Sequence, residues 1–330
     1  MRKRSLAAAV VVALALAPGT LVRTAIPRGD EIDLSIVAID DLPEATSNDG
    51  FTREGVWELS SARLDFGGYS ALLALGADTL RAFSDRGRIL TFPAPGGSSP
   101  FATRFATLWN RGELGATVPD SEAATRDPAT GDYWVAFENT HSLIRYSRAS
   151  EFEAARLPPE WQGWYENSGV EAMARLPDGR FLVLPERADT GFLYPSDPAQ
   201  EVAPLAFRFA VPEDYNPTDM AALPDGRVLV LLRKLDRAFP PFAAAIAVAD
   251  PRTVEEGGEL EIRLLADLTT ILPRENYEAL ELAGVGEDGT IGLWLMSDDN
   301  LSAFQRTLLA RIGWAGDAPW RKAHEKAREG

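Results

Sequence analysis

The chain of 330 residues contains no cysteine and only two histidines, His141 and His324. The absence of thiols excludes disulfides, lipoprotein attachment and thiol catalysis. Two histidines are too few for a histidine-based zinc site, and they argue equally against a histidine phosphatase mechanism. The sequence also lacks a Gly-x-Ser-x-Gly elbow, a phosphate-binding glycine loop and a dinucleotide fingerprint. A serine esterase of the α/β-hydrolase type is therefore not supported.

Positive charge is also scarce, because 33 lysines and arginines face 49 acidic residues and leave a net charge of −16. Nucleic acids and anionic membranes need a basic surface, so we expect neither as a partner. Cations fit this composition, as does a soluble protein that must avoid association. We therefore expect a monomer that acts on a small molecule.

One apolar run, residues 6–17, follows the basic residues Arg2, Lys3 and Arg4. A basic segment before a 12-residue apolar core is typical of a secretory signal, and the core is short for a membrane span. We predict a signal peptide over residues 1–19 and a linker over residues 20–29. The alternative is an uncleaved N-terminal anchor. Either form predicts a periplasmic or secreted protein.

Five copies of one phrase follow, each about fifty residues long. Each copy has a polar lead residue, an apolar stretch, a turn such as Pro177-Asp178-Gly179-Arg180, and a second apolar stretch that ends in charge. The lead residues are Ser70, Glu122, Glu171, Asp219 and Glu278. Strand–turn–strand units of this period are typical of a β-propeller. We predict one all-β propeller domain over residues 30–314, followed by a charged tail of helical composition, residues 315–330.

The sequence shows only five units directly. We predict six blades, with the sixth formed if the strand-like segment 32–39 joins strands from the C-terminal end. Such closure would pair edge strands that are otherwise exposed.

Several phrases resemble one known family. They are Ser84-Asp85-Arg86-Gly87, the segment 167–174, Asn276-Tyr277-Glu278-Ala279-Leu280, and the segment 295–300 that ends in Asp298-Asp299-Asn300. They resemble the phytase-like family of exported bacterial propellers, described by an esterase-like activity of phytase. The resemblance covers about residues 30–313 and implies a propeller that hydrolyses phosphate or other esters, with calcium as a candidate cofactor. The sequence departs from the family pattern at Ser70 and at Arg233-Lys234, where a fully acidic ring would need acids.

Lead residues on the innermost strands of a propeller converge on its axis, so the four acidic ones should form a carboxylate ring. Further acids end the second strands and should lie near one rim: Asp85, Glu138, Glu186, Asp298 and Asp299. Crowded carboxylates repel unless a cation or protons relieve them, and oxygen-only sites suit calcium or magnesium. The predicted metal ligands are Glu122, Glu171, Glu278, Asp298 and Asp299. The predicted catalytic residues are Glu171, Glu278, Asp85 and Arg86.

Two classes of function remain open. The first is a metal-assisted hydrolase with its site at the channel mouth, where Arg86, Arg187 and Arg233 could grip phosphate oxygens. A metal-free version of it pairs two carboxylates as acid and base. The second is a noncatalytic binding propeller, in which the inner acids only accept backbone N–H bonds. Phytate itself is disfavoured, because its dense negative charge would meet an acidic protein.

Aromatic residues precede the third copy: Trp161, Trp164 and Tyr165. They could wall the channel mouth and stack a ring-shaped ligand. The alternative is a hydrophobic plug that packs one end of the ring.

Overall fold

The computed structural model describes residues 33–97, 102–108, 120–164, 169–186 and 188–329. The predicted signal peptide and linker lie outside this range and stay predictions. In the part of the chain that is described, no helix is long and apolar enough to cross a membrane.

Antiparallel strands joined by hairpins make up almost all of the fold, so the all-β prediction is confirmed. Four units contain four consecutive strands each. They are β4 (Tyr69–Ala74), β5 (Thr79–Ser84), β6 (Arg88–Pro93) and β7 (Arg104–Thr107); β8 (Ser121–Arg126), β9 (Tyr133–Phe137), β10 (Ser142–Tyr146) and β11 (Phe152–Arg156); β12 (Val170–Arg175), β13 (Phe181–Pro185), β14 (Thr190–Tyr194) and β15 (Leu205–Ala210); and β16 (Asn216–Ala222), β17 (Val228–Leu235), β18 (Phe242–Ala249) and β19 (Glu259–Asp267). The Asp-Gly hairpins form where the sequence predicts them, and Gly179 and Gly226 supply φ values near 90°.

A fifth unit joins the two ends of the chain. Its strands are β20 (Tyr277–Val285), β21 (Ile291–Ser297), β22 (Thr307–Trp314), β3 (Phe51–Ser60) and β1 (Ser35–Ala38), with the short β2 (Ser47–Asn48) paired to β3. The N-terminal strand β3 pairs along the whole of β22, from Thr307 opposite Leu59 to Trp314 opposite Phe51. Segment 32–39 contributes β1, which reaches the C-terminal strands through β3, so the N-terminal strands complete this sheet.

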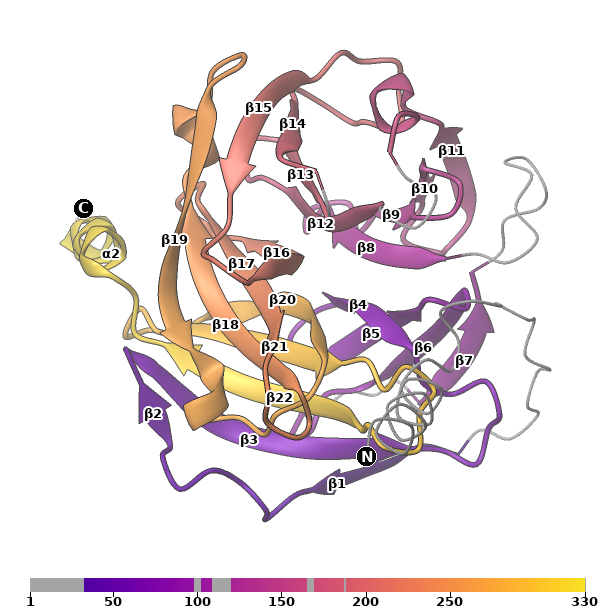
Figure 1. The fold of residues 1–330 in the computed structure, drawn as a ribbon, viewed down its shortest axis with the longest axis vertical. Helices are drawn as coiled ribbons and strands as arrows, with labels where there is room; N and C mark the ends of the chain where they lie inside the picture. The colour runs from indigo at the N-terminus through magenta and orange to yellow at the C-terminus, as the bar shows by residue number, and fades with distance from the viewer. Residues whose placement is uncertain (1–32, 98–101, 109–119, 165–168, 187, 330) are drawn as a thin grey trace, which may run out of the picture.

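The innermost strands β4, β8, β12, β16 and β20 lie side by side in chain order, and β20 returns to β4 (Figure 1). Five buried apolar clusters fill the spaces between neighbouring units. Because both faces of most sheets are covered, their strands read as continuous apolar runs; all seven residues of β21 are buried. At the outer edge, β15 pairs in parallel with β19 and links the third unit to the fourth.

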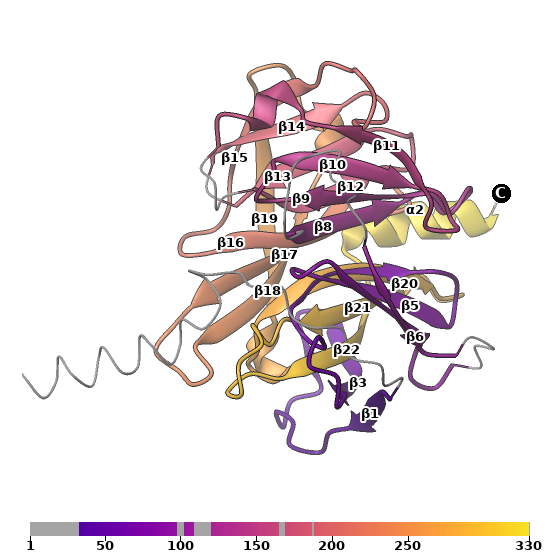
Figure 2. The same ribbon diagram turned by 90° about the vertical axis from the view of Figure 1, so that its right-hand side faces the viewer.

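The tail folds as helix α2 (Ala318–Glu329) at the periphery of the molecule (Figures 1 and 2). Trp320, 5% exposed, packs into the core and donates its Nε1–H to the Gly289 carbonyl at 2.7 Å. Just before the helix, Asp317 accepts a hydrogen bond from Arg227 at 2.8 Å. These contacts dock the helix against the fourth and fifth units.

Adjacent innermost strands are held together by side chains that accept backbone N–H bonds. The Leu280 N–H on β20 donates to Asp219 of β16 at 2.8 Å. The Arg175 N–H on β12 donates to Thr125 of β8, and the Ala74 N–H on β4 donates to Glu281 of β20, both at 2.9 Å. A buried N–H without an acceptor is costly, so these side chains stabilise the ring.

Replacing Asp219 should test this arrangement. Asp219 is 1% exposed and accepts N–H bonds from both Leu280 and Met220. Burial raises its pKa well above the ordinary value, although the two N–H bonds oppose that shift. We expect Asp219→Ala to lower the free energy of unfolding by about 2–4 kcal/mol, because two buried donors lose their acceptor. The two N–H groups bond to different oxygens of Asp219, so Asp219→Asn keeps one acceptor, cannot accept the second N–H through its amide nitrogen, and should lose less stability than Asp219→Ala. Equal losses for both variants in urea unfolding at pH 7 would contradict this account.

Candidate functional site at the acidic end of the ring

Each innermost strand begins with a β-bulge. At the start of every inner strand, the pairing with the second strand skips one residue: Ser70, Glu122, Glu171, Thr218 and Glu278. A bulge leaves its extra residue out of the ladder and re-aims that side chain. The bulges therefore gather five side chains at one end of the ring, which we call the acidic end.

The predicted carboxylate ring is wrong in the fourth unit, because the bulged residue there is Thr218 and not Asp219. Asp219 is paired with Leu231, and its carboxylate is used in the backbone bonds described above. Thr218 instead donates its hydroxyl to the Tyr277 carbonyl at 3.3 Å. Ser70 does the same in the first unit, donating to the Ser121 carbonyl. The hydroxyls of Ser70 and Thr218 thus connect neighbouring units through a hydrogen bond beside the next bulge. The other three bulged residues are glutamates.

A second set of acids reaches this end from the second strands. In four of the five units, the residue after the second strand donates its backbone N–H to the carbonyl of the residue two positions before the bulge: Asp85 to Gly68, Glu138 to Asp120, Glu186 to Gly169, and Asp298 to Asn276. A Cβ on Gly169 would lie only 2.7 Å from the Glu138 Cα, so glycine lets the second and third units approach closely there. Acids from different parts of the sequence are thereby brought together.

Five carboxylates of the second and third units form the densest group. The ligand oxygens of Asp120, Glu122 and Glu138 all lie within 4.8 Å of one another, and so do those of Glu138, Glu171 and Glu186. Glu138 belongs to both sets and is 7% exposed, while Asp120 is 3% exposed. We call these residues the five-carboxylate group. Its geometry could hold a metal ion.

One arginine partly balances these charges. Arg233 forms an ion pair with Glu278 and donates to the Asn276 Oδ1 at 2.7 Å. Burial alone would lower its pKa, but the charges of Glu278, Glu171 and Glu186 outweigh burial and raise it. The pKa of Glu171 is raised well above its ordinary value, first by burial and then by the charges of Glu186 and Glu278. The charge of Arg233 therefore opposes the rise in the pKa of Glu171 without cancelling it.

The first and fifth units contribute the remaining predicted residues. Asp298 is 5% exposed, and burial together with the charges of Glu278, Asp85 and Asp299 raises its pKa. Both carboxylate oxygens of Asp299 accept hydrogen bonds within the protein. The donors are the N–H groups of Gly68 and Leu301 and the Thr307 hydroxyl, each at 2.9 Å. The Arg86 Nε lies 3.6 Å from the Asp85 carboxylate. This side of the site is therefore rich in internal bonds.

Comparison with known proteins identifies the chain. A family model described as "Phytase-like: Esterase-like activity of phytase" matches residues 64–301, which is more than half of the sequence. The chain belongs to the phytase-like family. No curated protein matches the sequence.

Solved structures similar to this phytase-like chain share little sequence. The luciferin-regenerating enzyme is 14% identical, with 86% of this chain and 96% of that chain covered and a TM-score of 0.45. A protein of unknown function from Bacteroides thetaiotaomicron is 12% identical, with 86% and 73% covered and a TM-score of 0.44. The hydrazine synthase of Kuenenia stuttgartiensis is 13% identical, with 71% of this chain but only 57% of that chain covered, at a TM-score of 0.39.

Within the phytase-like chain, the predicted residues divide into two places. Glu122 and Glu171 lie in the five-carboxylate group. The other predicted residues, Glu278, Asp298, Asp299, Asp85 and Arg86, lie at the same end of the ring on the first and fifth units, outside both sets of close carboxylates found among the described residues. Their metal and catalytic roles stay predictions, and Arg187 lies outside the described residues.

Sequence reasoning missed Asp120 entirely, and it placed Glu138 and Glu186 at the rim without choosing them as ligands. A usable signal was present, because Asp120 and Glu122 stand two positions apart at a strand start and so lie near each other.

The aromatic segment before the third unit belongs to the core. Trp161 is fully buried and stacks on Trp164, with ring centroids 5.8 Å apart. Trp164 in turn packs edge-on against His141 and lies beside Phe192. Of the two alternatives considered, this arrangement favours the hydrophobic packing role for Trp161 and Trp164. Tyr165 lies outside the described residues.

The five-carboxylate group fits a hard divalent cation. It offers only oxygen donors, and calcium takes six to eight oxygen ligands, with carboxylates prominent among them. Burial and the charges of Glu186 and Glu278 raise the pKa of Glu171 even though the charge of Arg233 opposes them. A bound cation would add further positive charge there.

The metal-free protein should show this repulsion as a pH-dependent loss of stability. A glutamate whose pKa is raised by folding destabilises the fold as pH rises from its ordinary value of about 4.5 toward the raised value. We therefore expect Glu171→Gln to be more stable than the wild type at pH 8 in chelator, and this difference to shrink toward pH 4. Glu261→Gln, which alters an exposed residue on β19, should track the wild type at every pH. If the stability difference between Glu171→Gln and the wild type stays constant between pH 4 and 8, the pKa of Glu171 is not raised by folding.

Proposed function

We propose that this phytase-like protein is a calcium-assisted hydrolase of phosphate or related esters, with its site at the acidic end of the channel. The convergence of the five-carboxylate group, in a member of a family described by esterase-like activity, carries this proposal. We further propose that the ring has five blades, and that the protein is an exported, periplasmic or secreted monomer that acts on small molecules. The five apolar clusters between successive units support the blade number.

Each member of the site has a role in this proposal. Asp120, Glu122, Glu138, Glu171 and Glu186 would hold the cation, with Glu138 at their centre because it belongs to both close sets. Calcium bound there would neutralise an ester oxygen and lower the pKa of a bound water. Asp298 holds its proton to higher pH than an ordinary aspartate, which suits a group that donates a proton to the leaving oxygen.

The arginines fit a different role from the one predicted. Arg233 is tied to Glu278 and Asn276, and Arg86 lies beside Asp85, so both are engaged by the protein itself. Their contribution in this proposal is to limit repulsion among the acids. The metal-free version, in which a protonated and an ionised carboxylate act as acid and base, remains an alternative with the same residues.

A noncatalytic binding propeller is the competing function, and two residues favour it. Asp219 and Asp299 both use their carboxylates to accept backbone N–H bonds, as that alternative predicts for inner acids. Turnover therefore has to be measured separately from cation binding.

Glu138 offers the sharpest test of the proposed site. In calorimetry the wild type should bind calcium, and its melting temperature should rise with calcium concentration because only the folded state forms the site. Glu138→Gln should weaken calcium binding at least about tenfold, because one oxygen ligand shared by both close sets loses its charge. The same variant should lose hydrolysis in a panel of phosphate and carboxylate esters assayed with calcium, magnesium or chelator.

Glu261→Gln is the matched control and should bind calcium and hydrolyse esters like the wild type. Full ester hydrolysis by Glu138→Gln in excess chelator would refute the calcium-assisted site. Calcium binding without turnover of any ester in the panel would support the binding propeller instead.

A further inference from the structure

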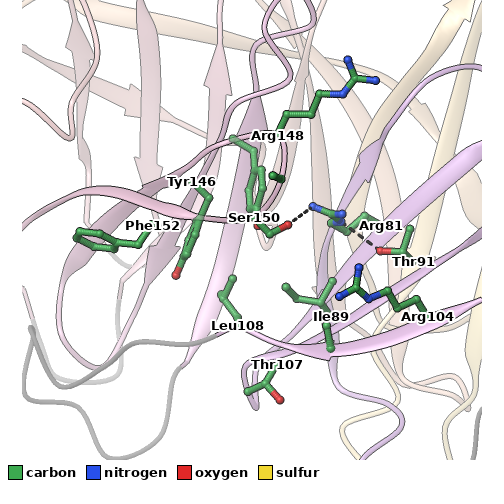
Figure 3. A pocket seen from close by; sticks show the side chains of 13 residues that line it. Arg81, Ile89, Thr91, Arg104, Thr107, Leu108, Tyr146, Arg148, Ser150 and Phe152 are labelled. Atoms are coloured by element: carbon green, nitrogen blue, oxygen red, sulfur yellow. Dashed lines mark hydrogen bonds between the residues drawn. The ribbon is translucent and has the colours of Figure 1, made fainter.

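A cavity of about 690 Å³ lies between the first and second units, among their outer strands (Figure 3). One wall comes from β5, β6 and β7 and the other from β9, β10, β11 and the loop before β11. Its polar lining includes Arg81, Arg104, Arg148 and Ser150. We call it the arginine cavity. It is distinct from the acidic end of the ring, which is built from the starts of the innermost strands.

The charge of this cavity is unusual for a protein with a net charge of −16. Its lining includes three arginines and no carboxylate. Among the described residues, none of the three forms an ion pair with an acid, although arginines elsewhere in the chain commonly do, as Arg227 does with Asp317. Burial and the nearby charge of Arg104 both act to lower the pKa of Arg81. Positive charge is thus concentrated here without a counterion among the carboxylates that the structure describes.

Neutral groups fix the position of Arg81. Its Nη1 donates to the Ser150 hydroxyl at 2.9 Å, and its Nε donates to the Thr91 hydroxyl at 3.2 Å. The guanidinium also lies over the Tyr133 ring, 5.4 Å from the centroid. Figure 3 shows the guanidinium groups of Arg81 and Arg104 on the same side of the cavity. Hydroxyls orient Arg81 without cancelling its charge, so an anion that enters would meet one preorganised guanidinium with Arg104 beside it.

The rest of the cavity is apolar and aromatic. Tyr146 stacks on Tyr133 with ring centroids 5.2 Å apart, and both line the cavity. Ile89 and Leu108 add buried aliphatic surface, and Phe152 is 48% exposed at the edge. Aromatic walls favour a flat, apolar ligand body through offset or edge-on contacts. A cavity of this size that combines apolar walls with few polar groups has the composition of a small-molecule site.

A second cavity of about 450 Å³ adjoins the same arginines. Arg81, Thr91, Arg104 and Arg148 line both spaces, and Arg126 is added in the second. The arginines therefore lie between the two spaces, and the aromatic side chains Tyr133, Tyr146 and Phe152 line only the first. This arrangement suits a ligand with an acidic head and an apolar body.

We propose that the arginine cavity binds a small organic anion, whose carboxylate or phosphate head is held by Arg81 and Arg104 and whose apolar or aromatic body lies along Tyr133, Tyr146 and Phe152. The proposal is independent of the hydrolase site, because it uses residues of opposite charge at a different place in the fold. Arg81 orients the head group, and Arg104, exposed on β7, completes the donor pair.

Calorimetric titration in calcium-free buffer with chelator tests the proposal, with benzoate and phenyl phosphate as probes. Benzamide, which has a similar ring without the charge, is the comparison ligand. We expect at least one anion to bind saturably with one site per chain, about tenfold or more tighter than benzamide. Whichever anion binds more tightly identifies the head group, carboxylate or phosphate. High salt should weaken this binding, since charge dominates it.

Arg104→Gln should weaken binding of the preferred anion about tenfold, because one charged donor is lost. Arg208→Gln removes an equally exposed arginine on β15, outside the cavity, and should stay within twofold of the wild type. Because Arg104 is exposed, the melting temperature of its variant should match that of the wild type. The proposal is overturned if neither anion binds saturably, if benzamide binds as tightly, or if Arg104→Gln binds as the wild type does.

Discussion

The acidic end of the ring depends on a backbone constraint, the β-bulge at the start of every innermost strand. Each bulge pushes one side chain out of the ladder, at Ser70, Glu122, Glu171, Thr218 and Glu278. In four units a backbone hydrogen bond beside the bulge also fixes the residue that follows the second strand. Two side chains per unit are thus directed to one end of the ring by main-chain geometry, whatever their chemistry. Charge at this end is then set by which residue occupies each bulge.

Acids gathered in this way repel one another and oppose folding unless positive charge lies nearby. The positive charge of the protein is distributed unevenly among them. The fifth unit meets Arg233 from the fourth, so Glu278 has a cation and an amide within hydrogen-bonding distance. The charge of Arg233 also acts on Glu171, but burial and the charges of Glu186 and Glu278 outweigh it and raise the pKa of that carboxyl. Strain of this kind persists only where the surrounding structure determines it. The imbalance points to the five-carboxylate group, rather than to Glu278, as the place where an external cation would stabilise the fold most.

The repeated phrase was enough to predict the strands and the common end of their lead residues, because turn chemistry and apolar stretches are local signals. It could not set the bulge in the fourth unit, where Thr218 and Asp219 are both polar and a shift of one residue changes which side chain faces the channel. The expected joining of the two ends does occur, but the sequence did not show that β3, rather than segment 32–39, would pair along β22. Nor could it show that Arg233 would engage Glu278 across 45 positions. Each miss concerns long-range pairing or a one-residue register, which composition does not encode.

Arginine placement separates two kinds of charge in this fold. Hairpin arginines are matched locally, as when Arg180 bonds Asp178 and Arg252 bonds Asp250, two residues away in each case. Such pairs complete a turn, and the neighbouring carboxylate neutralises the arginine, so little electrostatic attraction remains for an anionic ligand. Arg81 and Arg104 have no such partner among the described carboxylates, and both line the same cavity from strands of the first unit. Hydroxyls hold Arg81 in place, the charge of Arg104 acts on it, and a bound anion would relieve that repulsion. The ring thus has two charge-imbalanced places of opposite sign: an acidic end that a cation would stabilise and a basic cavity that an anion would stabilise.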